Sequence, residues 1–186
     1  MAALIRATVC SGNPHKLEEF HELYPDWELE LLAGVSFPPE DGVTYYENAL
    51  IKARYGRLVG PRDRWMLGDD SGIEVAALGG GPGVQTARWA EGRHVEKLLA
   101  ALDGEADRRA QYVCELVCIA PDRRELRGTG VLRGTVADAP AGGEGFGFDP
   151  VFVPDGERLT VAELGEAWKA EHSHRALAAR ALRDAI

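Results

Sequence analysis

The sequence predicts an α/β protein with a mixed β-sheet, and three observations support this. Short apolar runs typical of strands intermix with amphipathic helical patterns along the chain. Strand-like runs in the second half form hairpin-like pairs. The 186 residues contain no internal repeat and no obvious linker, so we expect a single domain over residues 1–186.

The first half predicts a strand and two helices. Residues 4–10 read as a buried strand. Asn13 suits an N-cap and Pro14 the first helical position, so a helix should begin at Asn13 with Lys16 in its first turn. A second amphipathic helix covers residues 47–59. Its apolar face consists of Ala49, Leu50, Ala53 and Leu58.

The middle and the end of the chain predict further strands and helices. "WML" ends one strand at Asp69, and "IEVAAL" begins another. The elements that follow are a helix at 95–102, strands at 110–120 and 125–137, and a closing helix at 173–186.

Composition excludes several partners. A net charge of −9 argues against binding to a nucleic-acid backbone or to an anionic membrane. No window approaches the roughly 18 apolar residues of a membrane span, and the start lacks a signal peptide. Cys10, Cys114 and Cys118 form no metal-binding or redox pattern. We therefore expect buried thiols and a cytoplasmic protein that acts on a small molecule.

The stretch "SGNPHK", residues 11–16, is a candidate anion site. A strand, a polar turn and a helix start would direct backbone N–H groups and a helix dipole at an anion, and Lys16 adds a full charge. The stretch lacks the Walker A pattern. Junctions of this kind are also common as purely structural turns, so both interpretations stay open here.

Asp69 and Asp70 form a candidate metal site. Adjacent carboxylates on an extended chain point to opposite faces, so the two side chains should have different roles. Mg²⁺ takes carboxylate oxygens and usually bridges to phosphates. The alternative is an acidic structural turn. Glu40, Asp41 and Glu47 add acids near a helix start, where such residues are also common as caps.

Two further segments combine aromatic and basic residues. In "GFGFDP", residues 145–150, the phenylalanines can pack in a core or stack on a base. Lys169 precedes the last helix, and Ser173 can cap it. His174 and Arg175 would then lie in its first turn, where cations oppose the dipole, and this conflict hints at function.

Taken together, these segments resemble the inosine triphosphate pyrophosphatase family, the Ham1-like pyrophosphatases of non-standard purine nucleoside triphosphates. The resemblance spans nearly the whole chain. The matching blocks occur in the family's order and are "SGNPHKLEEF", "EDGVTYYENALIKA", "DDSGIEVAALGGGPGVQTARWA", "GFGFDPVF" and "TVAELGEAWKAEHSHRALA".

The resemblance implies an elongated mixed sheet flanked by helices, in two lobes with a central nucleotide cleft. It implies Mg²⁺-dependent hydrolysis of ITP, dITP and XTP to the nucleoside monophosphate and pyrophosphate, which cleanses the nucleotide pool. Members usually dimerise, so a homodimer is expected.

The resemblance also implies roles for individual residues. Asp70 would be the general base and, with Glu40, a metal ligand, while Asp69 orients the loop. Ser71 would contact the substrate. The triphosphate would be held by Ser11, Gly12, Asn13 and Lys16. The base pocket would be lined by Phe146, Gly147, Phe148 and Asp149. The nucleotide and its keto oxygen would be read by Lys169, His174 and Arg175.

The chain departs from the family pattern at several positions. Ser11 replaces Thr, Phe148 replaces Tyr, Ala141 stands where Arg is common, and His94 lies near a frequent Asn in a shortened stretch. Other hypotheses are a Maf-like pyrophosphatase of pyrimidine or modified nucleotides, a nucleotide-binding regulator without hydrolysis, and a simple phosphatase. The "SHR" and "GFGFDP" blocks argue against the first, and the acids with Lys16 argue against the second.

Overall fold

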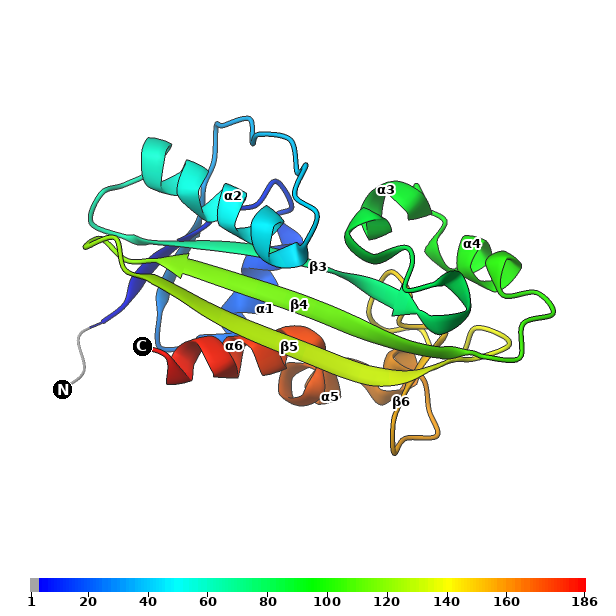
Figure 1. Cartoon of the computed structure of the whole chain (residues 1–186). Helices are drawn as coiled ribbons and strands as arrows, with labels where there is room; N and C mark the ends of the chain where they lie inside the picture. Colours follow the sequence, from blue (N-terminus) through cyan, green and yellow to red (C-terminus); the bar gives the residue numbers. More distant parts are fainter. Residues whose placement is uncertain (1–3) are drawn as a thin grey trace. The chain divides into compact units, whose positions relative to one another are not determined.

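The computed structural model describes residues 4–186, and these residues contain one six-stranded sheet with the strand order β2-β1-β3-β4-β5-β6 (Figure 1). The strands are β1 (Arg6–Val9), β2 (Glu28–Leu31), β3 (Trp65–Val75), β4 (Arg109–Ile119), β5 (Glu125–Val136) and β6 (Phe152–Pro154). β1 runs parallel to β2 and β3, whereas β5 and β6 are antiparallel. The predicted mixed α/β sheet is confirmed.

The helices are α1 (His15–Leu23), α2 (Tyr45–Val59), α3 (Thr86–Ala90), α4 (His94–Ala101), α5 (Val161–His172) and α6 (His174–Asp184). Short 3₁₀ turns lie at Ala76–Leu78 and Gly83–Gln85. The sequence predicted α1, α2, α4 and α6 but missed the short α3 and also α5, whose pattern is interrupted by Gly165 at φ +83°. The helix α1 was predicted to begin at Asn13, but it begins two residues later, at His15. The Asn13 side chain accepts the His15 N–H.

Two details of the sequence prediction were wrong. The strand predicted to end at Asp69 continues, since β3 is one strand from Trp65 to Val75. Basic side chains contact both aspartates, so burying the charges does not require the strand to break. Leu58, predicted on the apolar face of α2, is 81% exposed near the end of that helix.

The chain divides into two compact units. One consists of the chain up to Asp70 with residues 114–130 and 175–186, and the other of residues 71–113 and 131–174. The strands β3, β4 and β5 contribute residues to both units. The single-domain organisation stays a prediction.

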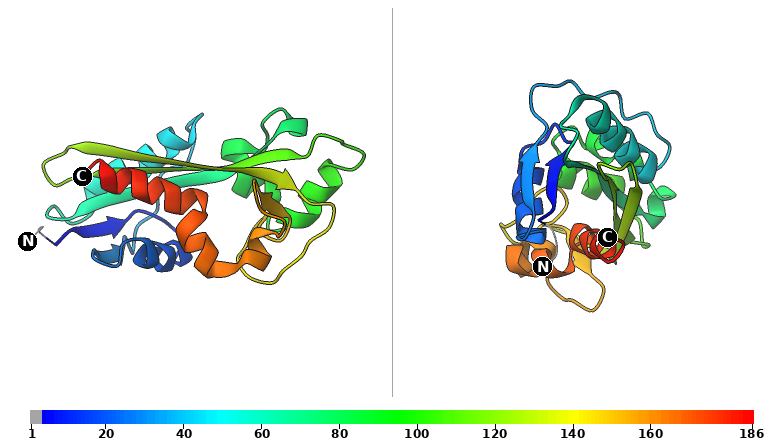
Figure 2. Two further views of the ribbon diagram at one scale, coloured as in Figure 1. Left: turned by 90° about the horizontal axis from the view of Figure 1, so that it is seen from below. Right: turned by 90° about the vertical axis from the view of Figure 1, so that its left-hand side faces the viewer.

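In the first unit, helices cover the sheet on both faces. Leu67 of β3 belongs to the apolar cluster with α1 and α6, whereas its neighbour Met66 belongs to the cluster with α2, as the alternation of a strand requires. The α2 backbone lies directly on β3 at Gly68, where a Cβ would collide with it. In the same way α6 lies directly on β5 at Gly128 (Figure 2).

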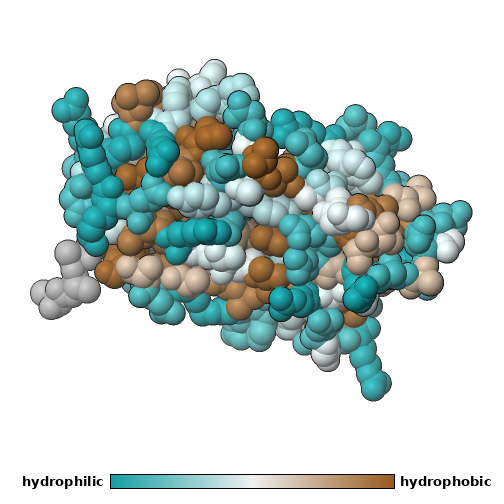
Figure 3. Space-filling model, viewed as in Figure 1, coloured by the Kyte–Doolittle hydropathy of each residue, from teal (hydrophilic) through white to brown (hydrophobic). Residues whose placement is uncertain are grey.

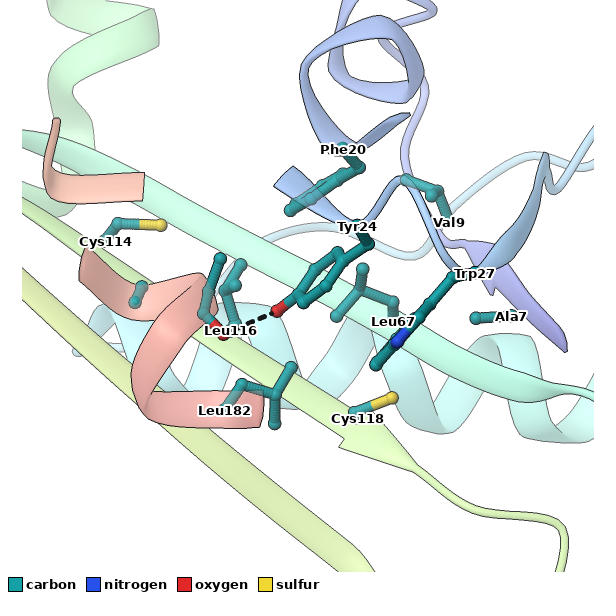
Figure 4. Close-up of a cluster of buried hydrophobic side chains, with 12 residues drawn as sticks. Ala7, Val9, Phe20, Tyr24, Trp27, Leu67, Cys114, Leu116, Cys118 and Leu182 are labelled. Atoms are coloured by element: carbon teal, nitrogen blue, oxygen red, sulfur yellow. Dashed lines mark hydrogen bonds between the residues drawn. The ribbon is translucent and has the colours of Figure 1, made fainter. Parts of the chain in front are cut away.

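Figure 4 shows the core between α1, α6 and the sheet. The Tyr24 hydroxyl donates to the Ala179 carbonyl at 3.0 Å. Cys114 and Cys118 lie in this cluster, and Cys10 lies on the opposite face. All three are buried free thiols, as predicted, and burial raises the pKa of Cys10 and of Cys114 to about 12.

The second unit has its own apolar core, which includes Ile73 of β3, Leu98 of α4, Tyr112 of β4 and Phe152 of β6. On the face drawn in Figure 3, hydrophilic residues separate small groups of apolar ones. Within residues 4–186, no helix has the length and apolar character needed to cross a membrane.

Candidate functional site

Asp69 is a buried carboxylate that contacts two basic side chains, Lys16 and Arg175, in the first unit. Its oxygens lie 2.7 and 2.9 Å from Lys16 Nζ, and one of them lies 3.8 Å from an Arg175 guanidinium nitrogen. Burial acts to raise the pKa of Asp69, but the charges of Lys16, Lys52 and Arg175 outweigh it and hold the pKa at about 2. Asp69 is therefore a permanent negative charge that positions Lys16 and Arg175.

Asp70 contacts a different set of groups, as its neighbouring place on the strand predicts. Its Oδ2 accepts a hydrogen bond from the Asn48 amide at 3.0 Å, and its Oδ1 lies 3.7 Å from Lys52 Nζ. Lys52 Nζ also donates to Glu40 Oε1 at 3.2 Å. Asp70 and Glu40 thus share one buried ammonium group. Burial raises the pKa of Asp70, although Lys52 and Asn48 oppose the shift.

Local structure explains why these side chains meet. The Thr44 hydroxyl and the Glu47 carboxylate form a capping box at the start of α2. Asn48 and Lys52 are one helical turn apart and are both buried. The Asn48 side-chain oxygen Oδ1 accepts the Gly42 N–H at 2.9 Å, which ties the preceding loop to the helix. Among the acids near this helix start, Glu47 therefore acts as a cap.

The loop before α1 is ordered by its own polar groups. Ser11 Oγ accepts the Asn13 N–H at 3.1 Å, and Asn13 Oδ1 accepts the His15 N–H at 3.1 Å. Gly12 is exposed, and a Cβ built there would meet no atom within 4 Å. The space beside this loop is open, and Lys16 lies in the helical turn that follows.

The donors near Asp70 suit a hard divalent cation. Within residues 4–186, no three acidic, histidine or cysteine side chains form a ready metal cluster. Asp70 and Glu40 nevertheless present carboxylate oxygens to the same neighbour, and the Glu40 side chain is 42% exposed. Mg²⁺ commonly binds one or two carboxylates and completes its shell with water and phosphate oxygens. Asp70 and Glu40 therefore fit the coordination that Mg²⁺ prefers.

In the second unit, Asp149 organises the loop at residues 145–149. Its Oδ2 accepts the Phe146 N–H at 3.0 Å and lies 3.1 Å from Lys169 Nζ. Its Oδ1 accepts a hydrogen bond from the Tyr112 hydroxyl at 3.3 Å. Burial lowers the pKa of Lys169, but the charge and hydrogen bond of Asp149 outweigh that effect, and the pKa is raised. Lys169 therefore stays protonated and positively charged.

The two phenylalanines of this loop lie in different surroundings. Phe146 is 58% exposed, and Lys169 Nζ lies 4.7 Å from its ring centre. Phe148 is 3% exposed and packs edge-on against His94, with ring centres 5.0 Å apart. Gly147 between them has φ +65°, a conformation that favours glycine. Only Phe146 offers an accessible ring.

The predicted site residues thus fall into one group in each unit. The first unit contains Ser11, Gly12, Asn13, Lys16, Glu40, Asp70 and Arg175. The second unit contains Ser71, Phe146, Gly147, Phe148, Asp149, Lys169 and His174. Ser71 is half-buried on β3, the His174 ring stacks on Tyr112, and Arg175 binds Glu19 at 3.0 Å.

Sequence reasoning missed three residues at these sites. Asn48 and Lys52 are spaced by four on a predicted helix, next to an acidic loop, and this spacing could have marked them as partners of the acids. Tyr112 gave no such signal, because it lies inside an apolar strand and its polar partner is distant along the chain.

The fold and the two groups of residues define a class of protein. It is a mixed α/β protein in which two adjacent acids on one strand are buried among basic side chains from the helices. The chain belongs to the Ham1 family, whose model matches residues 7–185. It is 39% identical to the dITP/XTP pyrophosphatase of Bdellovibrio bacteriovorus, with 93% of each chain covered. It is 40% identical to that of Thermus thermophilus, with 97% of this chain and 91% of the relative covered.

Solved structures agree with this assignment. The Staphylococcus aureus Ham1 protein matches with a TM-score of 0.84 and 32% identity, over 96% of both chains. A Ham1 protein from Coxiella burnetii matches with a TM-score of 0.83 and 34% identity, over 95% of both chains.

Proposed function

We propose that the protein is a hydrolase of non-standard purine nucleoside triphosphates that converts ITP, dITP and XTP to the monophosphate and pyrophosphate. The observation that carries the proposal is the near-full-length similarity to relatives named dITP/XTP pyrophosphatases. The acids on β3 and the lysines that contact them from α1 and α2 support it, because phosphate chemistry uses such acids and fixed cations.

Lys16 and the loop from Ser11 to Asn13 hold the triphosphate. The open space beside Gly12 leaves room for a phosphate near the positive end of the α1 dipole. Lys16 is held by Asp69 and adds a charge-assisted hydrogen bond. Asp69 therefore acts through Lys16 and leaves Asp70 for the reaction.

Asp70 accepts the proton of the attacking water. As water adds, the P–O bond between the α- and β-phosphates breaks and pyrophosphate leaves. A carboxylate whose pKa is raised by burial is a better proton acceptor than an ordinary one. Asp70 and Glu40 would hold Mg²⁺, which offsets phosphate charge when bound. Asn48 and Lys52 keep the Asp70 carboxylate in place.

The second unit supplies recognition of the purine. Phe146 offers an exposed ring for stacking, Phe148 supports the loop from within, and Gly147 joins them. Asp149 fixes the loop. Lys169 and His174 read the nucleotide and its keto oxygen, together with Arg175 of the first unit. Ser71 contacts the substrate from β3.

Two expectations about the whole molecule belong to this proposal. The protein acts as a homodimer, since members of the family usually dimerise. It works in the cytoplasm, and three free thiols in its core are compatible with a reducing compartment.

The test is pyrophosphate release with Mg²⁺ present, from dITP and XTP against dATP, dGTP and dTTP at equal low concentration. Fast release from dITP and XTP is the expected result. Comparable rates on dTTP would favour a Maf-like specificity, and release of orthophosphate in place of pyrophosphate would contradict the reaction. An assay without added metal tests the requirement for Mg²⁺.

A further inference from the structure

Tyr112 joins two parts of the second unit that are far apart in sequence. Its hydroxyl donates to Asp149 Oδ1 at 3.3 Å, and Asp149 organises the loop at residues 145–149. Its ring stacks on the His174 ring, with centres 4.7 Å apart and planes 17° apart. The Tyr112 ring also packs against Phe152 of β6, with ring centres 4.4 Å apart. One side chain of β4 thus contacts both the loop and the first residue of α6.

Packing alone does not explain the hydroxyl. Tyr112 is 6% exposed, and a phenol buried to this degree needs a polar partner. Burial raises the pKa of Tyr112 well above its ordinary value, so the group stays protonated and donates to the carboxylate. A phenylalanine would fill the same space without a buried polar group.

The loop also lacks a hydroxyl of its own at a position where the family pattern has one. Phe148 stands where that pattern has Tyr, and its ring is enclosed by His94 and Trp89. The hydroxyl that contacts Asp149 Oδ1 comes from Tyr112 of β4.

We propose that Tyr112 is a positioning residue for purine selection, which fixes the Asp149 carboxylate with its hydroxyl and the His174 ring with its aromatic face. The proposal rests on the proposed function. Asp149 and His174 act on the base, so Tyr112 affects which base binds and leaves the hydrolytic step at Asp70 unaltered.

The test is Tyr112→Phe, which keeps the ring and removes only the hydroxyl. We expect the KM for dITP to rise about three- to tenfold, the net effect of one ordinary hydrogen bond, because the hydroxyl acts on the base only through Asp149, with kcat within about twofold. The ratio of kcat/KM for dITP over dATP should fall by a similar factor. The matched control is Tyr24→Phe, which removes a buried phenol hydroxyl bonded to a backbone carbonyl in the first unit. It should lower the Tm but leave the ratio unchanged.

Each other outcome overturns the inference. Equal loss of kcat/KM on dITP and dATP, or the same change in ratio with Tyr24→Phe, would mean that the hydroxyl only stabilises the fold. An unchanged KM in an active Tyr112→Phe enzyme would refute the positioning role of Tyr112 and leave the proposed function intact. A wild-type enzyme with no activity on dITP or XTP would refute the proposed function, and the inference with it.

Discussion

The two units hold their charged side chains in different ways. In the first unit, Asp69 and Asp70 of one strand contact cations from several elements, and each carboxylate has its own set of partners. In the second unit, one carboxylate, Asp149, receives donors from the loop, from β4 and from α5. The first arrangement distributes charge over rigid elements, and the second gathers it at one loop.

Under the proposed function, this difference would separate the hydrolytic chemistry in the first unit from substrate selection in the second. A site on a strand and two helices keeps reacting groups in fixed places, which hydrolysis requires. The loop at residues 145–149 presents the exposed Phe146 ring between Gly145 and Gly147, and its position depends on a few hydrogen bonds. Changes at Asp70 in the first unit should therefore reduce turnover, whereas changes in the loop of the second unit should alter substrate affinity and choice.

The largest effect is expected from Asp70→Asn. The amide keeps the size of the side chain and can still accept the Asn48 hydrogen bond, but it cannot take up a proton or supply a second carboxylate oxygen. We expect kcat to fall at least about a hundredfold, as for loss of a general base. The Tm should stay close to that of the wild type, and steady-state pyrophosphate release measures the effect.

The control for that variant is Asp103→Asn, which removes an exposed carboxylate after α4. It should leave kcat unchanged. Near-normal turnover of the Asp70 variant would refute its role as the base, and a collapsed Tm would assign it a structural role.

A second comparison lies within the loop, between Phe148→Ala and Phe146→Ala. Removing the buried Phe148 ring leaves a cavity against His94 and should cost about 3–5 kcal/mol of unfolding free energy. Removing the exposed Phe146 ring should cost less than about 1 kcal/mol, but raise the KM for dITP about fivefold or more through lost stacking. Urea unfolding and steady-state kinetics measure the two effects. Equal stability losses would mean that the loop is packed differently.

The sequence predicted the fold class and most helices because apolar periodicity and caps are local signals. The family was recognisable from five sequence blocks in order. The division of labour between Asp69 and Asp70 could also be anticipated from strand alternation. What the sequence did not reveal depends on distant partners: Lys52 between two acids, Tyr112 on Asp149, and a strand that continues past a charged pair because lysines neutralise it.

Lys16→Ala in the first unit is expected to reduce activity less than Asp70→Asn does. The variant loses the charge that contacts the triphosphate, and the KM for dITP should rise about tenfold, with a smaller change in kcat. Asp69 also loses its nearest cation, so the Tm should fall moderately. Arg62→Ala, which removes an exposed cation elsewhere in the same unit, is the control. An unchanged KM would argue against the role of the loop in holding phosphates.

The smallest effect concerns His94, which packs on Phe148 in the second unit. Burial lowers the pKa of His94 below 6.5, and the nearby Glu96 only partly opposes this shift. The folded state therefore binds fewer protons than the unfolded chain, and His94 should reduce stability as the pH falls below 6.5 toward the lowered pKa. His94→Asn should shrink the loss of urea resistance between pH 7.5 and pH 5.5, whereas His21→Asn, at an exposed position on α1, should not. If His94→Asn left the pH dependence intact, burial of the His94 imidazole would not account for the loss of stability at low pH.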